Sequence, residues 1–205
     1  MLTVERIFGT GELATQTLYG ARWRPGVDAY TRLEQVPGAS APSLIQYDAE
    51  TGRREVILPA SRLVPSGWSG GGSMTLNLLF RSPELYRTGM SVAPVSNERY
   101  YDTIYEARYM GLPQQNAEGY RRGSPISFAR NLRGNLLLVH GSGDDNVHFQ
   151  NSEALIDTLV AAGKPFTMMD YPGRTHCICE GEGTTVHLYH LLTRYLTTNL
   201  PAGGR

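Results

Sequence analysis

The stretch that decides the fold is Gly67-Trp68-Ser69-Gly70-Gly71. It fits the pattern G-x-S-x-G, in which a sharp turn from a strand into a helix lifts the serine hydroxyl out of a sheet. Small residues on both sides of Ser69 let the backbone turn without collision, and the N–H of Gly70 can then face a developing oxyanion. Taken alone the motif is weak, because a glycine-rich turn or linker also matches it.

Two further polar side chains follow predicted strands downstream of this motif. Asp144 comes after the apolar run 136–139, which suits a parallel strand buried on both faces, and His176 comes after a predicted strand over 166–171. An acid at the carboxyl end of a parallel strand lies at the edge of the sheet where ligands bind. Ser, Asp and His in that order, each just past a strand, is the chain order of α/β-hydrolases. We therefore predict Ser69 as nucleophile, His176 as base and Asp144 as the acid that orients the histidine.

Each of these residues also has a simpler interpretation. Asp144 or its neighbour Asp145 could cap the helix that starts soon after, and a lone histidine in a loop is most often solvated. A metal cluster built on His176, Cys177 and Cys179 is a weaker alternative, because zinc uses C-x-C less often than C-x₂-C. We predict no metal and no cofactor, and we expect the two cysteines to be free thiols, since thiols this close in sequence seldom reach disulfide geometry with each other.

The pattern along the chain predicts two parts with a boundary near residue 65. In the first part, residues 19–23 and 29–33 form one predicted hairpin, and 44–47 and 54–58 form another, which together make an antiparallel sheet the size of one propeller blade. The second part alternates strands with amphipathic helices and predicts a parallel sheet covered by helices. The predicted domains are a blade-like β segment over 1–65 and part of an α/β-hydrolase domain over 66–205.

Bulk composition excludes several kinds of partner. Nineteen Lys and Arg balance nineteen Asp and Glu, so no net charge attracts nucleic acid or an acidic membrane. No run approaches the roughly 18 apolar residues of a membrane span. The N-terminus lacks the apolar core of a signal peptide, so we expect no export signal in this chain and leave its compartment open.

Several motifs together resemble one family, the prolyl oligopeptidase family of serine peptidases, in its dipeptidyl peptidase IV branch. The stretches that carry the resemblance are 67–72 (GWSGGG), 92–96 (VAPVS), 100–105 (YYDTIY), 108–113 (RYMGLP) and 140–150 with its DDNVH core. The match runs from Gly67 to the C-terminus without a large gap. Residues 2–8 and the turn at 47–52 are similar to the first blade of that family's propeller.

The resemblance implies a hydrolase domain capped by a β-propeller, and a peptide substrate with Pro or Ala at its second position. By the resemblance, Val95, Tyr101, Tyr105 and Val147 line the pocket for the proline ring, and Asn146 contacts the neighbouring substrate carbonyl. An aromatic and branched wall suits a flat apolar ring. Family members are frequently periplasmic or extracellular.

One departure from the family lies between Val64 and Gly67, where the resemblance implies the rest of the propeller and the first half of the hydrolase domain. That missing middle supplies a tyrosine hydroxyl as second oxyanion donor in the family, and losing such a donor costs on the order of a hundred- to a thousandfold in rate. Two alternatives therefore stay open, a catalytically dead remnant and a weak carboxylesterase-type α/β-hydrolase. Exposed sheet edges make a homo-oligomer a further expectation.

Overall fold

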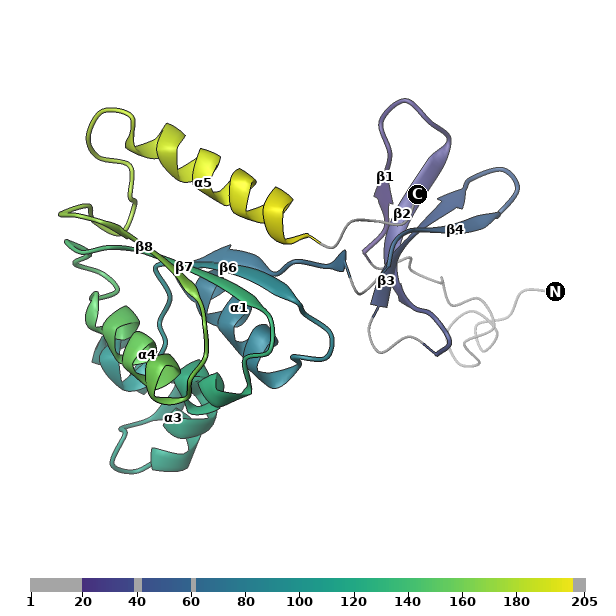
Figure 1. Cartoon of the computed structure of the whole chain (residues 1–205). Coiled ribbons are helices and arrows are strands. Elements are labelled where there is room, and N and C mark those ends of the chain that lie inside the picture. The colour runs from purple at the N-terminus through teal and green to yellow at the C-terminus, as the bar shows by residue number, and fades with distance from the viewer. Residues whose placement is uncertain (1–19, 39–41, 60–61, 201–205) are drawn as a thin grey trace, which may run out of the picture. The chain divides into compact units, whose positions relative to one another are not determined.

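The computed structural model describes residues 20–38, 42–59 and 62–200 (Figure 1). The chain divides into two compact units, residues 1–60 and residues 61–205. The family-like segment at 2–8 and the first residue of the predicted strand 19–23 lie outside the described residues. Among the helices that are described, none combines the length and the apolar character that crossing a bilayer requires.

The N-terminal unit contains an antiparallel sheet of four strands in the order β1-β2-β3-β4. The strands are β1 (Arg22–Trp23), β2 (Ala29–Gln35), β3 (Pro42–Asp48) and β4 (Arg54–Leu58). At the turn from β3 to β4, the Asp48 carboxylate accepts hydrogen bonds from the N–H groups of Glu50 (3.2 Å) and Thr51 (2.8 Å). Short polar side chains close turns in this way. The strand pairing confirms that the two predicted hairpins form one antiparallel sheet.

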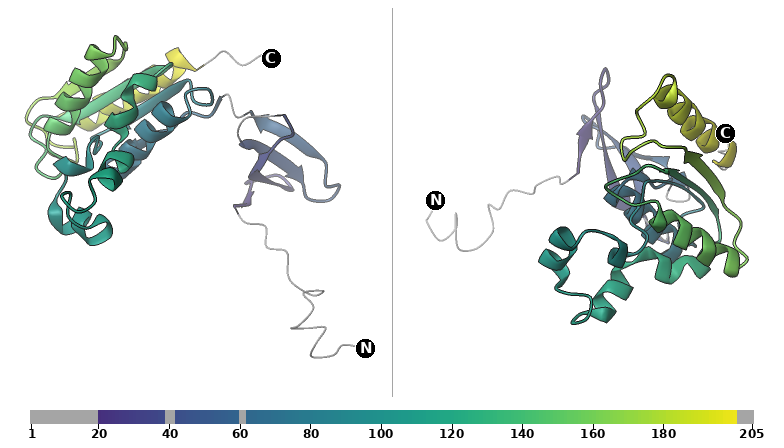
Figure 2. Two further views of the ribbon diagram at one scale, coloured as in Figure 1. Left: turned by 90° about the horizontal axis from the view of Figure 1, so that it is seen from below. Right: turned by 90° about the vertical axis from the view of Figure 1, so that its left-hand side faces the viewer.

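The C-terminal unit is built on a parallel sheet in the order β5-β6-β7-β8. Its strands are β5 (Ser66–Trp68), β6 (Thr88–Val92), β7 (Asn135–Gly141) and β8 (Thr167–Tyr171). Helices α1 (Gly70–Arg81), α4 (Gln150–Ala161) and α5 (Thr184–Asn199) follow β5, β7 and β8, and the segment between β6 and β7 holds η3 (Glu98–Tyr100), α2 (Thr103–Met110), α3 (Ala117–Gly123) and η4 (Pro125–Asn131). Helices α1 and α4 cover one face of the sheet and α5 covers the other (Figures 1 and 2). The predicted partial α/β-hydrolase fold is confirmed.

Strand β7 shows why the apolar run at 136–139 is continuous rather than alternating. Leu136 and Leu138 are fully buried in the cluster that includes residues of α1 and α4. Leu137 and Val139 are fully buried in the other cluster, together with Leu188 of α5. Because successive side chains of a strand point to opposite faces and both faces are covered, every position of this strand must be apolar.

Strand β5 lies at the edge of the sheet and pairs with β6 alone among the described strands. Pro65 comes directly before it, and its carbonyl accepts a hydrogen bond from the N–H of Met90 (3.0 Å). Proline has no N–H to donate, so it is tolerated at the start of an edge strand. The sequence entering the serine turn is therefore compatible with the strand it forms.

Helix α1 ends at Arg81, and the N–H of Ser82 donates to the Leu78 carbonyl (3.0 Å) as a C-terminal cap. Met74 of this helix is 59% exposed. The helix begins at the serine turn itself, so the turn sets which side of α1 meets the sheet, and Met74 lines a cavity instead.

Candidate active site

Ser69 occupies a strained turn between the end of β5 and the start of α1. Its backbone has φ 56° and ψ −123°, in a region that few non-glycine residues adopt. The Ser69 N–H donates to the Val92 carbonyl (2.9 Å), and its own carbonyl accepts from the N–H of Ser73 (2.9 Å). The turn is thus held to β6 on one side and to α1 on the other. Gly70 is the first residue of α1, so its N–H has no acceptor within the helix.

The turn allows a sharp test of the two glycines that flank Ser69. A Cβ at Gly67 would lie 2.4 Å from the carbonyl carbon and oxygen of Gly71, whereas a Cβ at Gly71 would meet nothing within 4 Å. We expect Gly67→Ala to lower the free energy of unfolding by about 1–3 kcal/mol. Gly71→Ala is expected to leave it unchanged or raise it by less than about 1 kcal/mol. Urea unfolding of both variants checks this, and equal effects would contradict it.

Asp144 is the most tightly held residue of the predicted catalytic set. The residue is 6% exposed, and its Oδ1 accepts hydrogen bonds from the N–H groups of Asn146 (3.0 Å) and Val147 (2.9 Å). Its Oδ2 lies 2.8 Å from Nδ1 of His176 and 3.1 Å from Nε2 of His140. The loop after β7 therefore fixes one oxygen with backbone donors and directs the other at a histidine.

His140 is a member of the site that the sequence analysis missed. It is fully buried, its Nδ1 lies 2.7 Å from Oγ of Ser152, and its Nε2 lies 2.8 Å from the Val147 carbonyl. Burial lowers the pKa of His140, so the ring is neutral, Nε2–H donates, and Nδ1 accepts from the Ser152 hydroxyl. His140 thereby braces the loop that carries Asp144. Its place at the end of the apolar strand, four residues before Asp144, was the only available signal.

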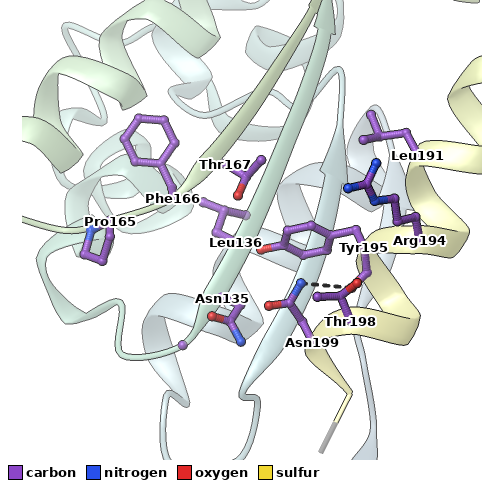
Figure 3. A pocket seen from close by; sticks show the side chains of 11 residues that line it. Asn135, Leu136, Pro165, Phe166, Thr167, Leu191, Arg194, Tyr195, Thr198 and Asn199 are labelled. Atoms are coloured by element: carbon purple, nitrogen blue, oxygen red, sulfur yellow. Dashed lines mark hydrogen bonds between the residues drawn. The ribbon is translucent and has the colours of Figure 1, made fainter.

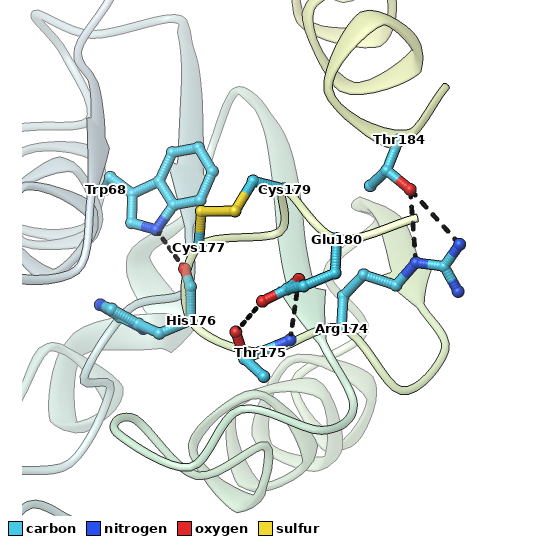
Figure 4. The surroundings of a disulfide bond; sticks show 8 residues. All are labelled: Trp68, Arg174, Thr175, His176, Cys177, Cys179, Glu180 and Thr184. Atoms are coloured by element: carbon cyan, nitrogen blue, oxygen red, sulfur yellow. Dashed lines mark hydrogen bonds between the residues drawn. A yellow bond between two sulfur atoms is a disulfide. The ribbon is translucent and has the colours of Figure 1, made fainter. Parts of the chain in front are cut away.

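His176 lies in the loop between β8 and α5, and its side chain is 21% exposed. Because its Nδ1 donates to Asp144, its Nε2 is left as the basic nitrogen. The indole N–H of Trp68 donates to the His176 carbonyl (2.9 Å), so the histidine loop is tied to the residue just before Ser69 (Figure 4). Within the described residues, neither Oγ of Ser69 nor Nε2 of His176 has a hydrogen-bond partner. Catalytic hydrogen bonds are often long without substrate and tighten in the complex.

The expectation of free thiols was wrong, because Cys177 and Cys179 form a disulfide directly after His176 (Figure 4). Their Cα atoms are 5.1 Å apart, within the usual range for such a bond. Ile178 between them has φ 47°, and its N–H donates to the Thr175 carbonyl (3.0 Å). This left-handed residue turns the chain so that both sulfurs face each other. The bond also removes the two thiolates on which the alternative metal cluster depended.

The disulfide predicts the thiol content of the protein. Unfolded in denaturant without reductant, the chain should show no reactive thiol, and after reduction it should show two. The bridge closes a very short loop, so its loss should cost at most about 2 kcal/mol on the loop-entropy account. The double variant Cys177→Ser, Cys179→Ser, compared with wild type by thermal unfolding, checks the second part. Two thiols in the unreduced chain would contradict the bond.

A cavity of about 580 Å³ opens beside Ser69. Of the residues predicted to bind substrate or oxyanion, Gly70, Val95, Tyr101 and Tyr105 line it. The rings of Tyr101 and Tyr105 meet edge to face with centroids 5.6 Å apart, and the Tyr101 hydroxyl donates to Oδ1 of Asn146 (2.9 Å). Val147 and Asn146 are not among the lining residues. Val147 is fully buried, and Asn146 reaches the cavity wall only through its contact with Tyr101.

Two carboxyl groups also line this cavity, and the sequence analysis assigned neither. Glu98 belongs to η3 and Glu106 to α2, and both side chains line the cavity. Burial, and then the charge of Glu106, raise the pKa of Glu98 to about 7. The residues are eight positions apart in sequence, so only the fold between η3 and α2 brings them together.

The raised pKa of Glu98 predicts how stability depends on pH. The folded chain keeps a proton that the unfolded chain releases above the ordinary pKa of 4.5. Between the two values the folded state binds more protons, so stability falls as pH rises and levels off above about 7. Glu98→Gln should flatten this slope when urea unfolding is compared at about pH 5 and about pH 7.5. Glu118→Gln, at an exposed carboxylate paired with Arg121, should leave the dependence of stability on pH unchanged.

A second cavity, of about 460 Å³, lies where β7 and β8 begin (Figure 3). Its lining includes Asn135, Thr167, Tyr195 and Asn199, and the Asn199 amide donates to the Tyr195 carbonyl (2.9 Å). Ligands of open α/β sheets bind outside the carboxyl ends of the strands, and this cavity lies at the amino ends. Arg194 is its only charged lining residue among those described. We therefore place the candidate active site at the first cavity.

Comparison with known proteins agrees with this architecture. The model of the prolyl oligopeptidase family matches residues 49–202. The chain belongs to the prolyl oligopeptidase family. Within that family, the chain is similar to the dipeptidyl peptidase IV branch. It is 39% identical to dipeptidyl peptidase 8 of Homo sapiens over an alignment of 164 residues, and this alignment covers 77% of this chain and 18% of that protein. It is 48% identical over 122 residues to the probable dipeptidyl-aminopeptidase B of Trichophyton verrucosum, which covers 58% of this chain and 14% of that protein.

Solved structures of the same branch are also similar. The crystal structure of dipeptidyl peptidase 4 from Porphyromonas gingivalis matches with a TM-score of 0.68 and 43% identity, over 70% of this chain and 20% of that one. A putative dipeptidyl aminopeptidase IV from Bacteroides ovatus matches with a TM-score of 0.65 and 34% identity. The chain spans a fifth or less of the length of these prolyl oligopeptidase relatives.

Proposed function

We propose that this chain is a serine peptidase of the dipeptidyl peptidase type, with Ser69 as nucleophile, His176 as general base and Asp144 as its orienting acid. The observation that carries the proposal is the 2.8 Å contact between Nδ1 of His176 and Oδ2 of Asp144, together with a serine held at φ 56° whose neighbour Trp68 donates to the His176 carbonyl. A buried acid on Nδ1 selects the tautomer whose Nε2 accepts a proton. Residues 66–205 supply all of these groups, and residues 1–65 are proposed as the blade-like segment.

The proposed reaction is an acyl transfer in two stages. In the first, the Ser69 Oγ forms a bond to the substrate carbonyl carbon while its proton passes to Nε2 of His176, and the same proton then goes to the leaving amine as the C–N bond breaks. In the second, His176 takes a proton from water, the water oxygen bonds to the acyl carbon, and the proton returns to Ser69 as the ester bond breaks. The Gly70 N–H stabilises the oxyanion in both stages.

The proposed substrates are peptides with Pro or Ala at the second position. The cavity beside Ser69 supports this, because Val95, Tyr101 and Tyr105 give it branched and aromatic walls. Asn146 is the proposed contact for the neighbouring substrate carbonyl, and its amide oxygen already accepts the Tyr101 hydroxyl. The amide N–H₂ group is therefore left to donate to a carbonyl.

A fluorophosphonate probe tests the proposal, since it labels only a serine that a neighbouring base activates. Wild type should be labelled and Ser69→Ala should not. Equal labelling of the two chains, or none of either, would overturn the proposal and leave the catalytically dead remnant. If only wild type is labelled, cleavage of a Gly-Pro chromogenic substrate supports the peptidase, whereas cleavage of a simple acetyl ester alone would favour the carboxylesterase.

A further inference from the structure

The cavity beside Ser69 carries more negative charge than a pocket for proline or alanine requires. Glu98 and Glu106 both line it, together with Ser69 and the aromatic side chains. Glu106 is 7% exposed, so its carboxyl group lies almost entirely away from bulk water. A carboxylate at that depth is costly unless a cation or hydrogen-bond donors compensate it.

The protein itself supplies no such compensation within the part of the chain that the structure describes. Neither Glu98 nor Glu106 makes an ion pair there, and no backbone or side-chain N–H donates to the Glu106 carboxylate. The charge of Glu106 acts on Glu98 and favours the protonated form of that carboxyl group. A pair of acids that holds one proton carries a single negative charge, and one ligand cation bound beside the pair would neutralise it.

The walls of the cavity suit a long side chain that ends in a cation. Tyr101, Tyr105 and Tyr109 form a row of rings, with centroids 5.6 Å apart in the first pair and 5.2 Å apart in the second. Aromatic faces attract ammonium and guanidinium groups, and the methylene stem of a lysine or arginine packs on apolar surface. The three tyrosines line the same cavity as Ser69 and the two acids.

We infer that this cavity accepts the basic side chain of a lysine or arginine placed directly before the cut bond, with its cationic end on Glu98 and Glu106. The inference rests on the proposed peptidase function and extends its substrates beyond Pro and Ala. The raised pKa of Glu98 agrees with it, because a pair that keeps one proton carries the single negative charge that one bound cation neutralises.

Peptidyl diphenyl phosphonates test the inference on the full chain, because the Ser69 oxygen displaces phenoxide from phosphorus only if it is activated. Two N-acetylated probes are compared that differ in one side chain, a lysine analogue and its uncharged norleucine isostere. Wild type should react with the lysine probe roughly tenfold to a hundredfold faster, as expected for a charge-assisted hydrogen bond in a shielded site. Glu106→Gln should bring the ratio of the two reaction rates close to one. Glu118→Gln, at an exposed glutamate, should keep the preference.

The outcomes separate this inference from the proposed function. If fluorophosphonate labels Ser69 but the lysine and norleucine probes react equally, the inference is overturned and the peptidase proposal stands. If instead a prolyl probe with a free amino terminus loses reactivity in Glu106→Gln, the acids bind the substrate's terminal ammonium and the inference is again wrong.

A binding measurement keeps the test decisive if no probe reacts. In Ser69→Ala, n-butylguanidinium should shift the amide NMR signals of Glu98 and Glu106, whereas n-butanol should not. Glu106→Gln should lose the response to n-butylguanidinium. Equal responses to the two compounds, or a response that survives Glu106→Gln, would overturn the inference whatever the state of Ser69.

Discussion

Asp144→Asn is expected to slow fluorophosphonate labelling of Ser69 by on the order of ten thousandfold, the loss that the same change causes in other Ser-His-Asp sites. Oδ1 of residue 144 accepts two backbone N–H groups, so the asparagine oxygen must stay there and its NH₂ group must face the histidines. Nδ1 of His176 then has to accept rather than donate. This places the proton on Nε2, where a base is needed.

The neighbouring residue provides a matched control for this change. Asp145 is exposed, whereas Asp144 is 6% exposed and hydrogen-bonded to both His176 and His140. Ser69 in the Asp145→Asn variant should be labelled at a rate within about twofold of wild type, because removing the charge of an exposed carboxylate changes its interactions little. Labelling rates measured over a time course, with circular dichroism to confirm folding, check both variants. If Asp144→Asn and Asp145→Asn are labelled at similar rates, Asp144 does not orient His176.

The order of the elements and the positions of the three catalytic candidates followed from sequence, because each depends on local patterns. The run 136–139 is apolar at every position, which only a strand covered on both faces requires. Ser69, Asp144 and His176 each follow a strand, and parallel strands bring their carboxyl ends to one edge. The β3–β4 hairpin followed from the turn residues at Asp48 and Gly52 in the same way.

The features that escaped prediction depend on backbone angles or on contacts between segments. The disulfide requires Ile178 to adopt φ 47°, which an isoleucine rarely does and no sequence pattern signals. The pair of Glu98 and Glu106 forms only after η3 and α2 fold against each other. His140 was treated as part of a motif rather than as a brace for Asp144, because its partners Ser152 and Val147 become neighbours only in three dimensions.

Gly141→Ala is expected to lower the free energy of unfolding by about 1–3 kcal/mol and to reduce labelling of Ser69. The loop of Asp144 and the loop of His176 touch backbone to backbone at this point. A Cβ on Gly141 would lie 2.3 Å from the Arg174 carbonyl oxygen, and that oxygen also accepts the N–H of Gly143 (3.0 Å). Backbone cannot rotate aside as the end of a side chain can, so the two loops must separate.

Separating the two loops should move His176 away from Asp144, because Arg174 lies two residues before His176 and Gly143 lies directly before Asp144. Ser142→Ala serves as the control in the same loop, since it removes one exposed hydrogen bond, from the Gly173 N–H to Ser142 Oγ (2.9 Å), and adds no atom. It should cost less than about 1.5 kcal/mol and leave labelling intact. Urea unfolding and labelling of both variants measure the difference. If Gly141→Ala labels at the wild-type rate, close contact between the two loops is not what holds His176 on Asp144.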